Sequence, residues 1–100
     1  MDPVLNRRIS SIFVNELENF KKAMELLPHA ENEDQFQFIL HKIRPTMVIF
    51  EMESLIRHSE LILEKKKKGD EFSTDDEDWK TGIIHTEGAL GSLKTFLQSL

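Results

Sequence analysis

Residues 36–50, FQFILHKIRPTMVIF, have the pattern of an amphipathic helix. Apolar side chains recur along this stretch at intervals of three or four: Phe36, Leu40, Ile43, Met47 and Phe50. This is the spacing of a helical stripe that faces a protein core. At about 100° per residue, His41 lies roughly 140° from the centre of the stripe. We therefore predict a helix that buries one face and presents His41 to solvent.

Further helices are expected on both sides of this stretch, with bounds set by capping and stop signals. Asp2 and Pro3 suit the start of a first helix, and Pro28 suits its end. Asn32 with Gln35 three residues later resembles a capping box, so the second helix is expected to begin there. The chain before residue 36 therefore supplies one long helix and a short connection.

The second half of the chain contains two more helical patterns. A third helix is expected over residues 51–68, with Gly69 as its stop signal. Thr74 with Glu77 fits the capping-box pattern that opens a last helix. Pro45 interrupts the second helix, because proline lacks the backbone N–H, and it predicts a kink or an early end near Arg44.

The helices outside residues 36–50 are also amphipathic. Their expected core positions are Leu5, Ile9, Ile12, Phe13, Leu17, Phe20, Met24 and Leu27, then Met52, Leu55, Ile56, Ser59, Ile62 and Leu63, and finally Trp79, Ile83, Leu90, Leu93, Leu97 and Leu100. Four such helices bury their stripes most simply in an antiparallel four-helix bundle with up-down-up-down topology. We expect residues 1–100 to form this single all-α domain.

Composition narrows the possible functions. One hundred residues leave little room for a deep substrate cleft, which disfavours most stand-alone enzymes. The net charge of -5 disfavours nucleic acid as a partner. The longest apolar run has four residues, so no membrane insertion is expected, and the absence of cysteine fits a reducing compartment. We expect a monomeric cytoplasmic protein.

The residues near His41 suggest a chemistry. A neutral imidazole is a nucleophile near pH 7. Arg44 follows one turn later and is placed to pair with a phosphoryl oxygen, while Lys42 adds positive charge on a different face. Neither cation is a general base. This segment suits carrying a phosphoryl group better than catalysing its transfer unaided.

Apolar side chains also occur on the outward side of the same helix: Phe38, Pro45, Val48 and Ile49. A soluble protein seldom leaves such a patch exposed without using it for contact. We expect these residues, together with Gln37, to bind a partner. Two plainer interpretations stay open, namely that His41 is a surface histidine with no role, or that the helix is central and buried on two sides.

The stretch His41-Lys42-Ile43-Arg44-Pro45-Thr46 resembles the His-x-Leu-Lys-Gly-Ser core of histidine-containing phosphotransfer (HPt) domains. The resemblance covers the centre of the second helix closely and the rest by length, helix number and helix order. It implies that His41 is the phosphoacceptor and that Arg44 replaces the usual lysine. Pro45 stands where the family usually has glycine, and Phe50 and Glu51 fall where a glycine often separates two helices.

The resemblance also implies how the work is divided between proteins. The chain would be a phosphocarrier and not an enzyme, with no cofactor of its own. A response-regulator receiver domain would bring the aspartate, the lysine and Mg²⁺, and a hybrid sensor histidine kinase is a possible second partner. The alternative is a silent adaptor that docks a receiver or another helical partner without phosphotransfer. A small hydrolase using His41 is a weaker third interpretation, since no orienting carboxylate shares an obvious face with it.

The other polar groups have simpler interpretations. His29, His58 and His85 are expected to take no part in chemistry, and no His-x-x-x-His or Glu-x-x-His spacing predicts a metal site. The basic run at residues 65–68 and the acidic run at residues 75–78 suit the C-terminus of one helix and the N-terminus of the next.

Overall fold

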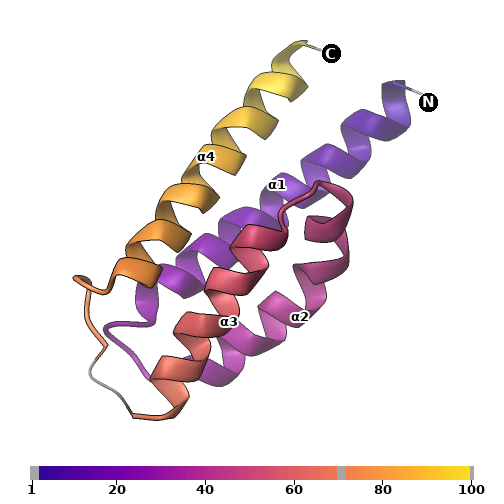
Figure 1. The fold of residues 1–100 in the computed structure, drawn as a ribbon. Coiled ribbons are helices and arrows are strands. Elements are labelled where there is room, and N and C mark those ends of the chain that lie inside the picture. Colours follow the sequence, from indigo (N-terminus) through magenta and orange to yellow (C-terminus); the bar gives the residue numbers. More distant parts are fainter. Residues whose placement is uncertain (1–2, 70–71, 100) are drawn as a thin grey trace.

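The computed structural model describes residues 3–69 and 72–99, with side chains from residue 7 onward. Its regular elements are four helices: α1 (Pro3–Leu26), α2 (Glu33–Ile49), α3 (Glu53–Lys67) and α4 (Glu77–Ser99). Successive helices run in opposite directions, so both termini lie at the same end of the bundle (Figure 1). Each helix packs against two others: α1 and α3 each contact both α2 and α4. The predicted all-α, antiparallel four-helix bundle is confirmed.

The core forms where the four apolar stripes meet. On α2 the buried side chains are Phe36, Leu40, Ile43 and Met47, as predicted. Two aromatic pairs connect α1 to α2 and its C-terminus: Phe13 stacks on Phe50 with ring centroids 4.7 Å apart, and Phe20 stacks on Phe36 at 5.2 Å. Burying each large apolar side chain contributes about 1.5–3 kcal/mol. This packing fixes which face of α2 remains outside.

The first part of α1 differs from the expected stripe. Ile9 and Ile12 are 43% and 53% exposed, whereas Ser10 and Val14 are buried. At this level the buried face of α1 is that of Ser10, Phe13 and Val14, while Ile9 and Ile12 border an open surface hollow with Thr46 of α2. The expected cap at Asp2 and the expected core residue Leu5 lie outside the described residues and side chains.

The connection between α1 and α2 lacks the predicted capping box. α1 ends at Leu26, two residues before Pro28, and Asn32 precedes α2 without a side-chain capping bond. The Asn32 amide nitrogen instead donates a hydrogen bond to the carbonyl of Ala23, 3.0 Å away. Asn32 therefore holds the loop against α1 and does not cap α2 as predicted.

The start of α4 is capped two residues later than expected. Asp76, not Thr74, is the capping residue, because its Oδ1 accepts a hydrogen bond of 3.0 Å from the backbone N–H of Trp79. The helix then continues to Ser99 through its glycines. Gly82 allows a close helix contact, since a Cβ there would lie 3.2 Å from Met24 Sδ. Leu100 lies outside the described residues.

α2 and α3 end in the same way with different residues. After α2, the N–H of Met52 bonds to the carbonyl of Met47 and that of Glu51 to Val48, with Glu51 in the left-handed region at φ 58°. After α3, Gly69 takes the equivalent position at φ 75° and its N–H bonds to the carbonyl of Lys66. Gly69 is therefore the predicted stop signal, while Glu51 occupies a conformation that favours glycine.

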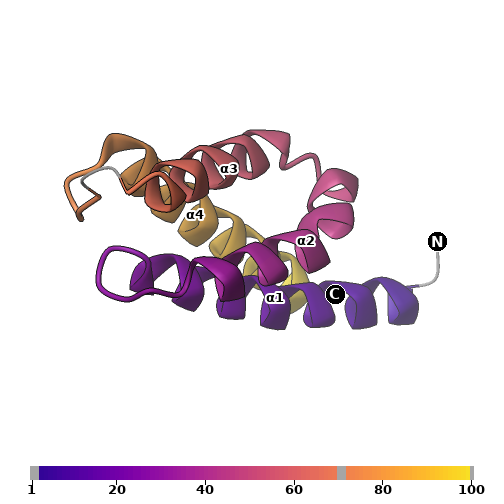
Figure 2. The same cartoon turned by 90° about the horizontal axis from the view of Figure 1, so that it is seen from below.

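The turn at Glu51 brings α3 back along α2 (Figure 2). α3 begins at Glu53, two residues later than predicted, and buries the predicted positions Leu55, Ile56, Ser59, Ile62 and Leu63. Among the described helices, none is long and apolar enough to cross a membrane.

Candidate functional site

His41 lies near the middle of α2, on the side away from the core, and its side chain is exposed. It borders a surface hollow between α2 and α3 whose lining residues are Gln37, Leu40, His41, Arg44, Glu60 and Leu63. We call this the His41 hollow. Among the described residues, no hydrogen bond or ion pair engages the imidazole of His41. Its ring nitrogens are therefore accessible to a docking molecule.

Arg44 borders the same hollow and is held by α3. Its Nη1 lies 3.0 Å from Oε1 of Glu60, and the two side chains are 55% and 47% exposed. At this exposure an ion pair contributes little to stability, about 0–1 kcal/mol. The guanidinium is thus beside His41, as the sequence predicted, but it already has a carboxylate partner.

The other end of the hollow also joins the two helices. The Lys67 ammonium donates a hydrogen bond to the side-chain oxygen of Gln37, one turn before His41. The antiparallel register explains both contacts, because Gln37 precedes Arg44 by seven residues and Lys67 follows Glu60 by seven. His41 therefore lies between two cross-helix contacts.

Lys42 and Phe38 lie on the opposite flank of α2, toward α1. They line a second hollow together with Ile39 and Ile43 of α2 and Glu16 and Asn19 of α1. The sequence placed Lys42 at the level of His41 but on a different face, and in the structure Lys42 does not line the His41 hollow. Positive charge beside His41 comes from Arg44.

The predicted apolar partner surface is exposed on α2. Phe38, Val48 and Ile49 are 69%, 48% and 76% exposed, and Pro45 is exposed as well. The interpretation that α2 is buried on two sides is therefore wrong. Phe38 borders the hollow on the α1 flank and His41 the hollow on the α3 flank, so these two side chains lie on different sides of the outward face.

Pro45 does not end α2. The sequence predicted a kink or an early end near Arg44, and of these two the early end is wrong, because helical residues continue through Pro45 to Ile49. Proline has no N–H, and the carbonyl of His41 thus lacks the donor that a residue four positions later normally supplies. Burial of Met47 and the stacking of Phe50 on Phe13 offset the cost of about 3 kcal/mol for an interior proline.

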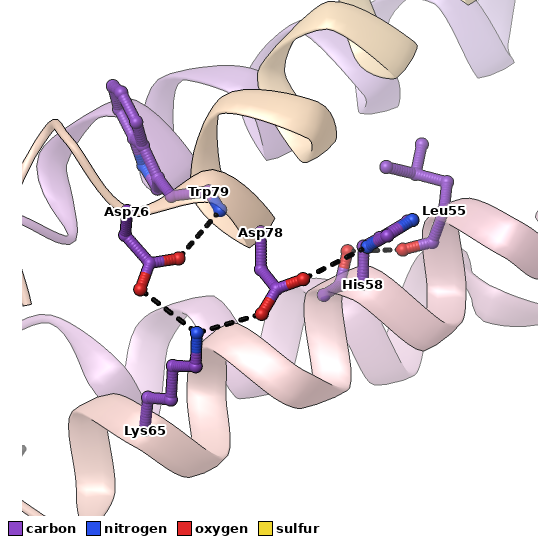
Figure 3. Close-up of polar contacts among 7 residues, drawn as sticks. Leu55, His58, Lys65, Asp76, Asp78 and Trp79 are labelled. Carbon is purple, nitrogen blue, oxygen red and sulfur yellow. Dashed lines mark hydrogen bonds and ion pairs between the residues drawn. The ribbon is translucent and has the colours of Figure 1, made fainter.

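A second polar region joins α3 to the start of α4 (Figure 3). Lys65 Nζ lies 3.0 Å from Asp76 Oδ2 and 2.8 Å from Asp78 Oδ2, and His58 Nδ1 lies 3.7 Å from Asp78 Oδ1. We call these four residues the Lys65 cluster. The ring of His85 meets that of His58 edge-on, with centroids 5.6 Å apart. The charge runs that the sequence assigned to helix ends thus form specific pairs.

The pairing in the Lys65 cluster shifts two pKa values. The hydrogen bonds that Lys65 donates, first to Asp78 and then to Asp76, raise the pKa of Lys65. Burial by itself raises the pKa of Asp76, but the hydrogen bonds from Lys65 and from the Trp79 N–H together outweigh burial and lower it. The charges of Lys65 and Asp76 are therefore stabilised in the folded state.

Glu60 is the member of the His41 hollow that sequence reasoning missed. Its position on α3 is polar and outward, like several others, and only the register of α3 against α2 selects it.

Across the described residues, no group of three or more His, Cys, Asp or Glu is arranged to hold a metal ion. No family model matches the chain, and neither a curated protein nor a solved structure matches it.

Proposed function

We propose that the chain is a phosphorelay carrier in which His41 exchanges a phosphoryl group with the aspartate of a response-regulator receiver domain. The observation that carries the proposal is an exposed, unengaged His41 that shares one hollow with Arg44 among the described residues. A ring nitrogen that no neighbour occupies is available as a nucleophile. Arg44 is placed to neutralise charge on the group that His41 receives.

The transfer step requires only one bond to form and one to break. The lone pair of the unprotonated imidazole nitrogen attacks phosphorus, and the bond from phosphorus to the receiver's aspartate oxygen breaks. The electron pair leaves with the aspartate as a carboxylate, and the proton on the other ring nitrogen stays in place. Return of the phosphoryl group to a receiver reverses these changes. Positioning and charge neutralisation are the main catalytic contributions in such a transfer.

The His41 hollow is consistent with a carrier that leaves catalysis to its partner. Its one acidic side chain, Glu60, is paired with Arg44, and apart from His41 itself its other lining residues offer no general base. In this proposal the receiver supplies the Mg²⁺, the aspartate and the lysine, and the chain binds no cofactor. The chain is then a phosphoprotein of a cytoplasmic two-component pathway and not an enzyme.

The docking surface in this proposal is the outward face of α2. Phe38, Val48 and Ile49 expose apolar area next to His41, and Pro45 adds to it. A receiver that covers these residues would bring its aspartate over the imidazole and exclude water from the transfer. A hybrid sensor histidine kinase that contains a receiver would use the same face.

The test is direct labelling of His41. Purified protein is incubated with phosphoramidate, whose N–P bond breaks as ammonia leaves, and separately with a phosphorylated receiver domain and Mg²⁺. We expect acid-labile, base-stable phosphate on the wild type and on His85→Gln, and none on His41→Gln. His85 is the matched control, because it is an exposed histidine on a different helix.

Two results would redirect the proposal. Equal labelling of the wild type and His41→Gln would show that another residue accepts phosphate. An unlabelled wild type that still binds the receiver, with undiminished binding by His41→Ala, would select the adaptor alternative.

A further inference from the structure

Glu60 places a negative charge in the hollow where a phosphoryl group would be carried. Its carboxylate lies 3.0 Å from Arg44 Nη1 and borders the same hollow as His41. A phosphoryl group brings about two further negative charges at neutral pH. Arg44 therefore has two competing partners, the carboxylate of Glu60 and the phosphoryl oxygens on His41.

The competition has a definite direction. When Arg44 pairs with Glu60, less of its positive charge is available to the phosphoryl group, and the Glu60 carboxylate repels the phosphoryl oxygens. Both effects disfavour the phosphorylated form of His41 relative to the free form. Since Arg44 and Glu60 are each about half exposed, water screens the effect and keeps it moderate.

We propose that Glu60 is a positioning residue that holds Arg44 on the α3 side of the hollow and so shifts the phosphotransfer equilibrium from His41 toward the receiver. This inference rests on the proposed function of His41. In the unphosphorylated protein, Glu60 keeps the guanidinium paired. In the phosphorylated protein, Arg44 must share its charge between Glu60 and the phosphoryl group, which makes the carrier a ready donor.

The test compares the distribution of phosphate at equilibrium. Radiolabelled phospho-receiver, Mg²⁺ and the carrier are mixed until the label on each protein is constant, and the two proteins are separated. Glu60→Gln keeps the size of the side chain and removes its charge. We expect it to raise the ratio of label on His41 to label on the receiver by about two- to fivefold, the range of an exposed ion pair.

Glu64→Gln is the matched control. Glu64 is on the same helix, one turn later, and is also exposed, but it does not line the His41 hollow. We expect its ratio to equal that of the wild type. Circular dichroism of all variants at the assay temperature shows whether they are folded, so a changed ratio cannot come from unfolding.

A double variant separates an action through Arg44 from simple repulsion. If Glu60 acts mainly through Arg44, Glu60→Gln changes the ratio less in an Arg44→Ala background than in the wild type. Equal ratios for labelled wild type and Glu60→Gln would overturn this inference and leave the function of His41 standing. An unlabelled wild type would overturn the proposed function, and this inference with it.

Discussion

The His41 hollow and the Lys65 cluster are both polar, both lie along α3, and differ in how completely their side chains are paired. In the Lys65 cluster, Lys65 contacts two carboxylates and Asp76 also caps α4. In the His41 hollow, within the described part of the chain, the imidazole has no polar contact. Paired groups hold helices together, whereas an unpaired nucleophile is available for chemistry. We therefore expect substitutions in the Lys65 cluster to change stability and substitutions in the His41 hollow to change function.

The largest expected effect tests whether one face of α2 serves stability and the opposite face serves function. Ile43 lies between His41 and Arg44 in sequence but is buried, with 1% of its surface exposed. Ile43→Asp should lower the free energy of unfolding by about 4 kcal/mol or more, since an unpaired carboxylate would enter the core. Urea denaturation followed by circular dichroism measures the loss.

The neighbouring Lys42 supplies the control for Ile43. It is exposed on α2, so Lys42→Asp should change stability by less than about 0.5 kcal/mol. A similar loss in both variants would mean that the exposed and buried faces of α2 have been assigned wrongly.

The next largest effect concerns the Lys65 cluster. Asp76→Ala removes the cap of α4 and one partner of Lys65, and it should lower the free energy of unfolding by about 1–2 kcal/mol. Labelling of His41 should stay unchanged. Asp75→Ala is the control, because Asp75 is 93% exposed and makes only a 4.0 Å ion pair.

The difference between wild type and Asp76→Ala should depend on pH. The folded-state pKa of Asp76 is lowered, so its contribution is complete above the unfolded pKa of about 3.9 and is lost as the pH falls through the folded pKa. The raised pKa of Lys65 keeps its contribution complete below its unfolded pKa. Chemical denaturation at pH 7 and at decreasing acid pH should show the two proteins converging only in acid.

Arg44→Ala should act on function more than on stability. Loss of one charge-assisted contact to the phosphoryl group should slow transfer from a receiver by about tenfold. The free energy of unfolding should change by less than about 1 kcal/mol, because the Arg44–Glu60 pair is half exposed. Arg57→Ala, an exposed arginine on α3, should leave the rate as it is; a matching slowdown there would point to net charge as the cause.

The smallest effect is a gain in stability at the turn that sets the α2–α3 register. Glu51 has φ 58°, a conformation that costs a residue with a side chain about 1 kcal/mol. Glu51→Gly should therefore raise the free energy of unfolding by up to about 1 kcal/mol. Glu53→Gly, at the first position of α3, should lower it instead. A loss in Glu51→Gly would show that its side chain makes a contact worth more than the strain.

Much of the fold could be predicted because helical periodicity is a local property. The stripes of α2 and α3, the exposure of His41 and the stop at Gly69 follow from spacing and residue type alone. Which side of a helix its neighbours cover is not a local property: Ile9 and Ile12 fit a stripe, but the buried face there is that of Ser10, Phe13 and Val14. The choice among Thr74, Asp75 and Asp76 as cap was equally out of reach, since each can accept the required hydrogen bond.

The candidate site, too, has a part that local spacing predicts and a part that depends on how the helices pack. Spacing along one helix predicted that Arg44 would lie beside His41, because residues three apart share a face. It could not predict that Glu60 would pair with Arg44, since that contact depends on the turn at Glu51 and the register it creates. It also placed Lys42 on a different face of α2 from His41, without fixing which neighbouring helix that face would adjoin.

Trp79 offers a consequence for measurement. It is the one tryptophan of a chain without tyrosine, and its Nε1 donates a 2.8 Å hydrogen bond to the carbonyl of Met24, which ties α4 to the end of α1. Its fluorescence therefore reports on a junction that does not line the His41 hollow. A change in its emission would mark the separation of α1 from α4. Chemistry at the His41 imidazole would leave the emission unchanged.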